Sequence, residues 1–206
     1  MSLQDFFKNF VGGLTLLVSG TYQIGDRIEV DGTQGDVIDV GIMYTQVMEI
    51  GGWVSGDQAT GRIVSIPNGA VIGRQVTNYT KENSFVWDEL TIPVTYESDI
   101  DRAQDIVQTV IEEETAGMAE HASEEIGEIR KKYFMSRRET RSRLYTELTD
   151  NWVNVHARYI TDARKRRETH NAVSERILEE FEAADDVEVA SQTIAITRFP
   201  GTGPVD

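Results

Sequence analysis

The chain contains no cysteine, and only three histidines occur among its 206 residues. Disulfides, thiol nucleophiles and thiolate metal sites are therefore excluded. His121, His156 and His170 are far apart, and their spacing does not match a zinc-ligand pattern. No nucleophile elbow, phosphate loop or dinucleotide-binding motif occurs either. We therefore expect no enzymatic activity, no cofactor and no metal.

Basic residues are scarce: 20 lysines and arginines are set against 35 acidic residues, for a net charge of −15. Such a chain repels phosphate backbones and anionic lipid head groups. We therefore expect no nucleic-acid partner and no peripheral membrane binding. The acidity fits a protein kept soluble in high salt, where ions screen self-repulsion, but an ordinary acidic bacterial protein fits equally well.

The sequence also lacks an apolar run near its start that is long enough to cross a membrane. The stretch Phe6–Val18 is interrupted by Lys8 and Asn9. A spanning helix needs about 20 apolar residues, and no basic segment precedes this stretch as in a signal peptide. We therefore expect the chain by itself to be soluble.

Residues 2–18 nevertheless carry apolar side chains at helical spacing, which predicts an amphipathic helix. Gly12 and Gly13 lie in its middle, where each costs about 1 kcal/mol relative to alanine. One interpretation is a frayed arm. The other is close helix packing, because a missing Cβ lets another backbone approach.

Short β-type runs with intervening glycines fill residues 20–84. Strands are expected at 27–30, 36–40, 42–50, 62–66 and 71–79. Pro67 and Asn68 are interpreted as a structural turn rather than a contact site. A longer loop over residues 51–61 contains four glycines and Trp53. Five strands in so short a segment predict a small, strongly bent barrel or sandwich.

A second unit is predicted over residues 85–190. Its expected elements are a strand at 87–96, helices from Asp99 and at 118–135, strands at 143–149 and 152–159, a helix at 167–183 and a strand at 187–199. Pro93 predicts an edge position for the first strand. Without the second helix the order is the ferredoxin-like split βαβ arrangement. We therefore expect an α+β fold with a helical insertion at about 116–142 and a C-terminal strand and tail at 191–206.

The basic run Arg164, Lys165, Arg166 and Arg167 is unusual in an acidic chain. At the start of a helix it opposes the macrodipole. A solvated surface is the ordinary interpretation. The alternative is a role in which these charges pair with acidic neighbours across a subunit boundary or line a portal.

Several segments, in this order, resemble the MscS-type mechanosensitive channel family: Leu3–Val18, Tyr22–Val30, Gly35–Val40, Val64–Asn68, Val76–Thr80 and Tyr96–Asp101. The β-domain motif positions among them are Gly25, Asp26, Gly35, Pro67 and Asn68. Residues 1–19 resemble the end of the family's pore-lining helix. The resemblance implies an Sm-like β-domain followed by an α/β domain.

This resemblance also implies a function and an assembly. It implies a homo-heptamer in the inner membrane whose cytosolic domains enclose a chamber with side openings, through which ions and small solutes pass. Rising membrane tension would favour the open state, and the pore helices would precede Met1. Gly12 and Gly13 would then be candidates for a gating pivot.

Two segments depart from the family pattern, namely the loop at 52–62 and the stretch at 116–142, which are both longer. They indicate a divergent subfamily. A soluble oligomeric binding module built on an Sm-like barrel, for instance for RNA, is the alternative function. The absence of a basic stripe with interleaved aromatic residues argues against it.

Overall fold

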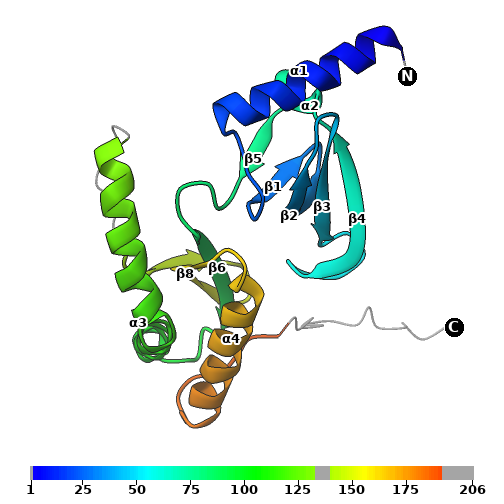
Figure 1. Ribbon diagram of the computed structural model, residues 1–206. Helices are drawn as coiled ribbons and strands as arrows, with labels where there is room; N and C mark the ends of the chain where they lie inside the picture. The colour runs from blue at the N-terminus through cyan, green and yellow to red at the C-terminus, as the bar shows by residue number, and fades with distance from the viewer. Residues whose placement is uncertain (1, 133–139, 192–206) are drawn as a thin grey trace, which may run out of the picture.

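The structure is a computed structural model that describes residues 2–132 and 140–191. Figure 1 shows two units, an N-terminal one with a helix lying across a β-sheet and a second one with helices against another sheet. The mixed α+β class expected from the sequence is confirmed.

Helix α1, Leu3–Ser19, begins with a capping box. The Ser2 hydroxyl accepts the Asp5 amide, and the Asp5 carboxylate accepts the Ser2 amide, which satisfies two donors that a helix start leaves free. Gly20 ends the helix at a φ of 56°, a left-handed conformation that glycine adopts without strain. Within the described ranges, neither α1 nor any other helix is long and apolar enough to cross a membrane.

The first sheet has five antiparallel strands in the order β4-β3-β2-β1-β5. Their bounds are β1 Arg27–Val30, β2 Thr33–Val40, β3 Tyr44–Ile50, β4 Ala59–Pro67 and β5 Val76–Asn78. Register shifts between Val37 and Asp39 and between Met48 and Ile50 mark irregularities that help the sheet to bend. Its core consists of Leu16, Tyr22, Ile28, Val30, Val37, Val47 and Ile66.

The strand predicted at 71–79 is only partly correct. Residues Ala70–Gly73 form the short helix α2, and β5 is limited to Val76–Asn78. The Val71 amide donates to the Asn68 carbonyl, which starts a helical turn. Figure 1 shows α2 directly beneath α1. Packing against α1 therefore overrides the β propensity of Val71 and Ile72.

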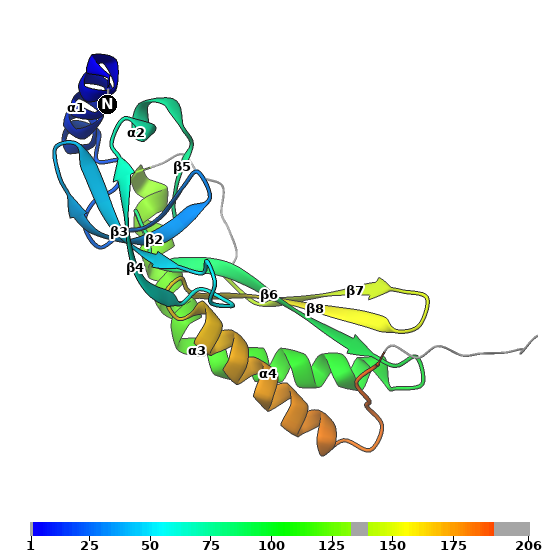
Figure 2. The same cartoon turned by 90° about the vertical axis from the view of Figure 1, so that its right-hand side faces the viewer.

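The second sheet has the strand order β6-β8-β7. Its strands are β6 Phe85–Val94, β7 Arg143–Leu148 and β8 Val153–Asp162. Helices α3, Ile100–Lys132, and α4, Arg166–Glu182, cover one face (Figure 2). Strand β6 lies at an edge, as Pro93 indicates. The core of this second unit includes Ile92, Val94, Val107, Ile111, Val155, Tyr159, Val173 and Phe181.

The two helices predicted from Asp99 and at 118–135 are one helix, α3, so the prediction of a separate second helix is wrong. No proline lies between Ile100 and Lys132 to stop it. Figure 2 shows that α3 changes direction along its length. Residues 133–139 of the expected insertion lie outside the described residues.

The strand predicted at 187–199 is described only as far as Ser191. Val189 forms an isolated antiparallel bridge with Val94. The Ala190 amide donates to the Pro93 carbonyl at 2.9 Å. The chain therefore starts to add a strand beside β6, and the rest of that expected strand lies outside the described residues.

Candidate functional site

Gly12 and Gly13 are the points where α1 meets the β-domain. A Cβ built on Gly12 would lie 2.2 Å from the Asn68 carbonyl oxygen, and one built on Gly13 would lie 2.1 Å from the Ile42 carbonyl oxygen. Real Cβ atoms do not approach so closely. The two glycines therefore allow direct backbone contact between α1 and two loops of the β-domain.

Asn68 is the polar centre of this contact. Its side chain is fully buried. The Thr45 hydroxyl donates to Asn68 Oδ1 at 2.8 Å, and Asn68 Nδ2 donates to the Gly41 carbonyl at 2.7 Å. The Tyr22 hydroxyl lies 3.0 Å from Thr45 Oγ1, and burial raises the pKa of Tyr22. Asn68 thus forms both the expected turn and a contact surface for α1.

Asn9 adds a side-chain hydrogen bond to the same contact. Although Asn9 is polar, it is one of the buried residues of α1. Its Oδ1 accepts the Gly69 amide at 3.0 Å. A Cβ on Gly69 would lie 2.6 Å from that oxygen. Asn9, which interrupts the apolar pattern in the sequence, therefore acts together with Gly12 and Gly13 in fixing the register of α1 on the β-domain.

The opposite face of α1 is apolar and exposed. Val18 is 83% exposed and Leu17 is 76% exposed. The other large apolar residues on this face are Leu3, Phe6, Phe7, Phe10, Val11 and Leu14. A contiguous apolar surface of this kind marks an interaction site.

The remaining β-domain motif residues shape the entry to β1 and the sheet register. Asp26 is buried and accepts the Gln23 amide at 2.9 Å and Asn78 Nδ2 at 2.8 Å. Gly25 has a φ of 93°. A Cβ on Gly35 would lie 2.6 Å from the Met48 carbonyl, so only glycine fits between β2 and β3 there.

The basic run lies at the joint between the two units of the same chain. Arg164 donates to the Gly25 carbonyl, Arg166 to Asp57, and Arg167 to the Ser55 carbonyl. Lys165 is exposed at the N-cap of α4. Three of the four predicted residues are therefore brought together with acceptors of the β-domain.

Arg166 also contacts Asp88, a buried carboxylate on β6. Arg166 Nη1 donates to Asp88 Oδ1 at 2.9 Å. The Tyr159 hydroxyl donates to Asp88 Oδ2 at 3.0 Å, and His170 Nδ1 lies 3.0 Å from the same oxygen. Burial and the Asp88 charge raise the pKa of Tyr159, and the hydrogen bond to Asp57 raises the pKa of Arg166.

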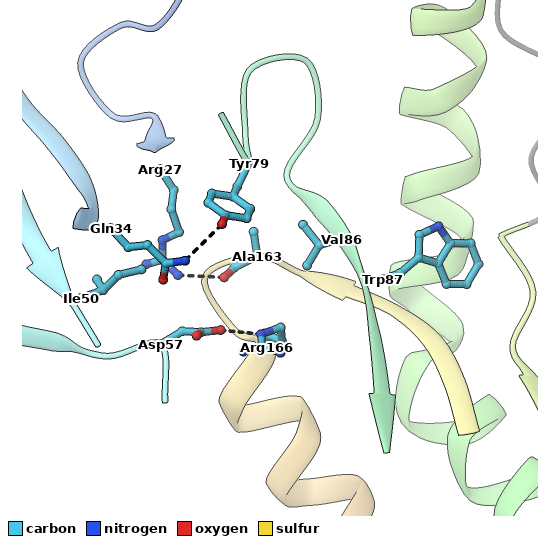
Figure 3. Close-up of a pocket in the computed structure, with 9 residues that line it drawn as sticks. All are labelled: Arg27, Gln34, Ile50, Asp57, Tyr79, Val86, Trp87, Ala163 and Arg166. Carbon is cyan, nitrogen blue, oxygen red and sulfur yellow. Dashed lines mark hydrogen bonds and ion pairs between the residues drawn. The ribbon is translucent and has the colours of Figure 1, made fainter. Parts of the chain in front are cut away.

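A cavity of about 280 Å³ lies between the units, beside these contacts (Figure 3). Arg27 crosses it, with Nη1 donating to the Ala163 carbonyl at 2.8 Å while Nε donates to Asp36 at 2.8 Å. Gln34, Ile50, Tyr79, Val86 and Trp87 complete its lining. Its cations are paired with carboxylates. In the described ranges, no group of three or more acidic, histidine or cysteine side chains could hold a metal ion.

Sequence reasoning missed Asn9, Asp57 and Asp88. The sequence does contain a signal for Asp88. In the alternating pattern of β6, Asp88 lies on the same inward face as Leu90, Ile92 and Val94. A charged residue at an inward position predicts a partner nearby. No sequence pattern points to Asp57, because its partner Arg166 is 109 residues away.

Residues 5–81 match the family described as "Mechanosensitive ion channel, beta-domain". An uncharacterized MscS family protein of Synechocystis is 30% identical over 122 residues, which cover 59% of this chain and 38% of that protein. One from Buchnera aphidicola (subsp. Baizongia pistaciae) is 29% identical over 114 residues, or 55% and 37% of the two chains. The small-conductance mechanosensitive channel MscMJ of Methanocaldococcus jannaschii is 26% identical over 120 residues, or 56% and 31%.

The fold matches over nearly the whole described chain. The crystal structure of closed-state MscS from Helicobacter pylori has a TM-score of 0.69 at 19% identity, covering 97% of this chain and 68% of that one. The cryo-EM structure of Arabidopsis thaliana MSL1 has a TM-score of 0.58 at 18% identity, covering 92% and 60%. These likenesses concern the fold alone.

Sequence and fold together define residues 5–81 as a mechanosensitive-channel β-domain joined to an α/β unit. The match of residues 5–81, the similarity to MscS family proteins and the shared fold together support an MscS-type mechanosensitive channel family member. This is a channel family and not an enzyme family. The aligned residues span only 31–38% of the length of the three curated relatives described above.

Proposed function

We propose that the chain is the cytosolic vestibule region of a mechanosensitive channel that opens under membrane tension and releases solutes on osmotic downshock. The observation that supports it is the position of α1. One face of this helix is fixed on the β-domain through Gly12 and Gly13, and the other face is apolar and exposed. The exposed face would pack against pore helices and neighbouring copies, in a homo-heptamer as the family resemblance implies.

In this arrangement α1 transmits movement between pore and vestibule. Tension does work in proportion to the in-plane area gained on opening, so it biases a two-state equilibrium as a ligand does. Backbone contacts at Asn68 and Ile42 leave little room for α1 to slide on the β-domain. A displacement of the helix would therefore move the whole β-domain, and Gly12 and Gly13 would serve as the pivot.

The vestibule would also filter ions. The chain has a net charge of −15, and walls of one sign concentrate counter-ions. Cations would therefore accumulate near the pore. In a salt gradient, the reversal potential of the channel should shift toward cation preference, and replacement of exposed glutamates by glutamine should reduce that shift.

Patch recording of the full-length protein under suction tests the central proposal. We expect stretch-activated current in a strain that lacks its own mechanosensitive channels. Gly12→Ala should alter the tension threshold, whereas Gly117→Ala, on α3 with open space around it, should not. Membrane-inserted protein without stretch-activated current would exclude gating by tension.

A further inference from the structure

The two units have separate apolar cores. The β-domain core contains residues from Leu16 to Ile66 and the α/β core contains residues from Ile92 to Val187, and among the described residues the two cores share no member. Four arginines instead reach across the joint: Arg27, Arg164, Arg166 and Arg167. Their acceptors across the joint are three backbone carbonyls and one carboxylate, so these four contacts are polar.

The loop before β4 supplies two of those acceptors, Ser55 and Asp57. Gly51, Gly52 and Gly56 in this loop have positive φ angles. A Cβ on Gly56 would lie 2.9 Å from Arg167 Cδ. The glycines therefore let the loop close tightly over the start of α4, and the loop is one of the two segments that are longer than in the family pattern.

Arg166 bridges the two units. On the α/β side it is held by Asp88, whose side chain is 5% exposed and is also bonded by Tyr159. On the β-domain side it is paired with Asp57, whose side chain is 22% exposed. The Arg166 side chain itself is 41% exposed. Asp88 orients the guanidinium, and the pair with Asp57 remains accessible to solvent ions.

This difference in exposure makes the joint sensitive to salt. The Debye length falls from about 10 Å at 0.1 M salt to about 3 Å at 1 M, so partly exposed pairs weaken. The apolar cores are not weakened in this way, because burial of apolar groups does not depend on charge. Added salt should therefore loosen the joint while each unit stays folded.

We propose that the loop at 51–58 and the start of α4 form an ionic-strength-sensitive clamp between the β-domain and the α/β unit. At low ionic strength, Asp57 and Arg166 hold the units docked, and at high ionic strength the docked population falls. The clamp consists of contacts within one chain, so it stands or fails independently of the proposed channel function.

Spin labels can measure the clamp directly, because the chain has no native cysteine to remove. Ile63→Cys on β4 and Leu178→Cys on α4 place labels on exposed positions, 56% and 50% exposed, of the two units. Distances are measured by double electron–electron resonance at about 0.1 M and about 1 M NaCl. Excess unlabelled chain removes distances between copies. Sucrose of equal osmolality separates ionic strength from osmotic pressure.

The ratio of docked to undocked populations should fall by about two- to fivefold in high salt, the factor expected for a partly exposed ion pair, and sucrose should leave this ratio unchanged. Asp57→Asn should give the reduced population already at low salt and respond little to added salt. Asp31→Asn is the matched control, because Asp31 pairs with Arg74 within the β-domain, and it should behave as the parent chain. Circular dichroism checks that each variant is folded. Equal populations at both salt concentrations, or an unchanged salt response in Asp57→Asn, would overturn the clamp.

Discussion

The Asn68 carbonyl oxygen occupies the place where a side chain on Gly12 would have to lie, 2.2 Å from the position of its Cβ. The contact between α1 and the loop at Asn68 is therefore possible only because residue 12 has no side chain. A single methyl group at residue 12 must push α1 away from the loop at Asn68 or distort that loop.

We expect Gly12→Ala to lower the free energy of unfolding by about 1–3 kcal/mol, the usual cost of overpacking. Chemical denaturation measures this change, and hydrogen exchange of the α1 amides should accelerate. Gly117→Ala is the control, since no atom lies within 4 Å of its Cβ position; it should be stabilising by up to about 1 kcal/mol. Equal changes in the free energy of unfolding for both substitutions would show that the close approach at Gly12 is not the cause of the destabilisation.

Asn9→Ala should release α1 without a steric change. The Gly69 amide loses its acceptor, and loss of a partner for a buried donor costs about 1–3 kcal/mol. Hydrogen exchange at Gly69 should therefore accelerate. Asn9→Asp keeps an acceptor oxygen and should retain the slow exchange at Gly69. An amide at Gly69 that exchanges equally slowly in Asn9→Ala would refute this role.

Asn68→Ala should cost more than an exposed asparagine does. Asn68 is fully buried, and its loss leaves Thr45 Oγ1 and the Gly41 carbonyl without these partners. We expect a loss of about 2–4 kcal/mol, because the buried Thr45 hydroxyl and the partly buried Gly41 carbonyl each lose a partner. Thermal unfolding measures it against Asn171→Ala, at an exposed position on α4. A similar small change in both variants would contradict the role of Asn68 as the polar centre.

The pair of Asp57 with Arg166 should depend on pH. The hydrogen bond from Arg166 lowers the pKa of Asp57 in the folded chain. Its stabilisation is therefore fully present above the unfolded-state pKa of about 4, and it is lost as pH falls through the lower folded-state pKa. The stability difference between the parent chain and Asp57→Asn should be constant above about pH 5 and vanish in acid. Denaturation at several pH values measures it, and a difference that persists in acid would count against the ion pair.

The sequence predicts local structure well where the pattern is strong. The apolar spacing of residues 2–18 predicts α1, whereas Gly12 and Gly13 leave two interpretations open, a frayed arm and a close approach by another backbone. Their contact partners could not be predicted, because Asn68 is 56 residues away from Gly12 and no periodic pattern connects them. The same limit applies to Arg166, whose charge is conspicuous but whose acceptor lies in a distant loop.

The two errors in secondary structure have different causes. At Val71 and Ile72, β-branched residues favour a strand, but packing against α1 imposes the short helix α2. In α3, glycine at residue 117 resembles a helix end, yet without a proline the hydrogen bonds continue. Tertiary contact decides the first case, and local propensity is too weak to stop the helix in the second.

The bridge between Val189 and Val94 has a consequence for association. A sheet edge with free backbone groups can recruit a strand from another molecule. The segment around Val189 occupies this edge at the end of β6, and Pro93 there has no amide to offer. A chain truncated before Val187 would uncover that edge together with part of the core, and would be prone to edge-to-edge aggregation.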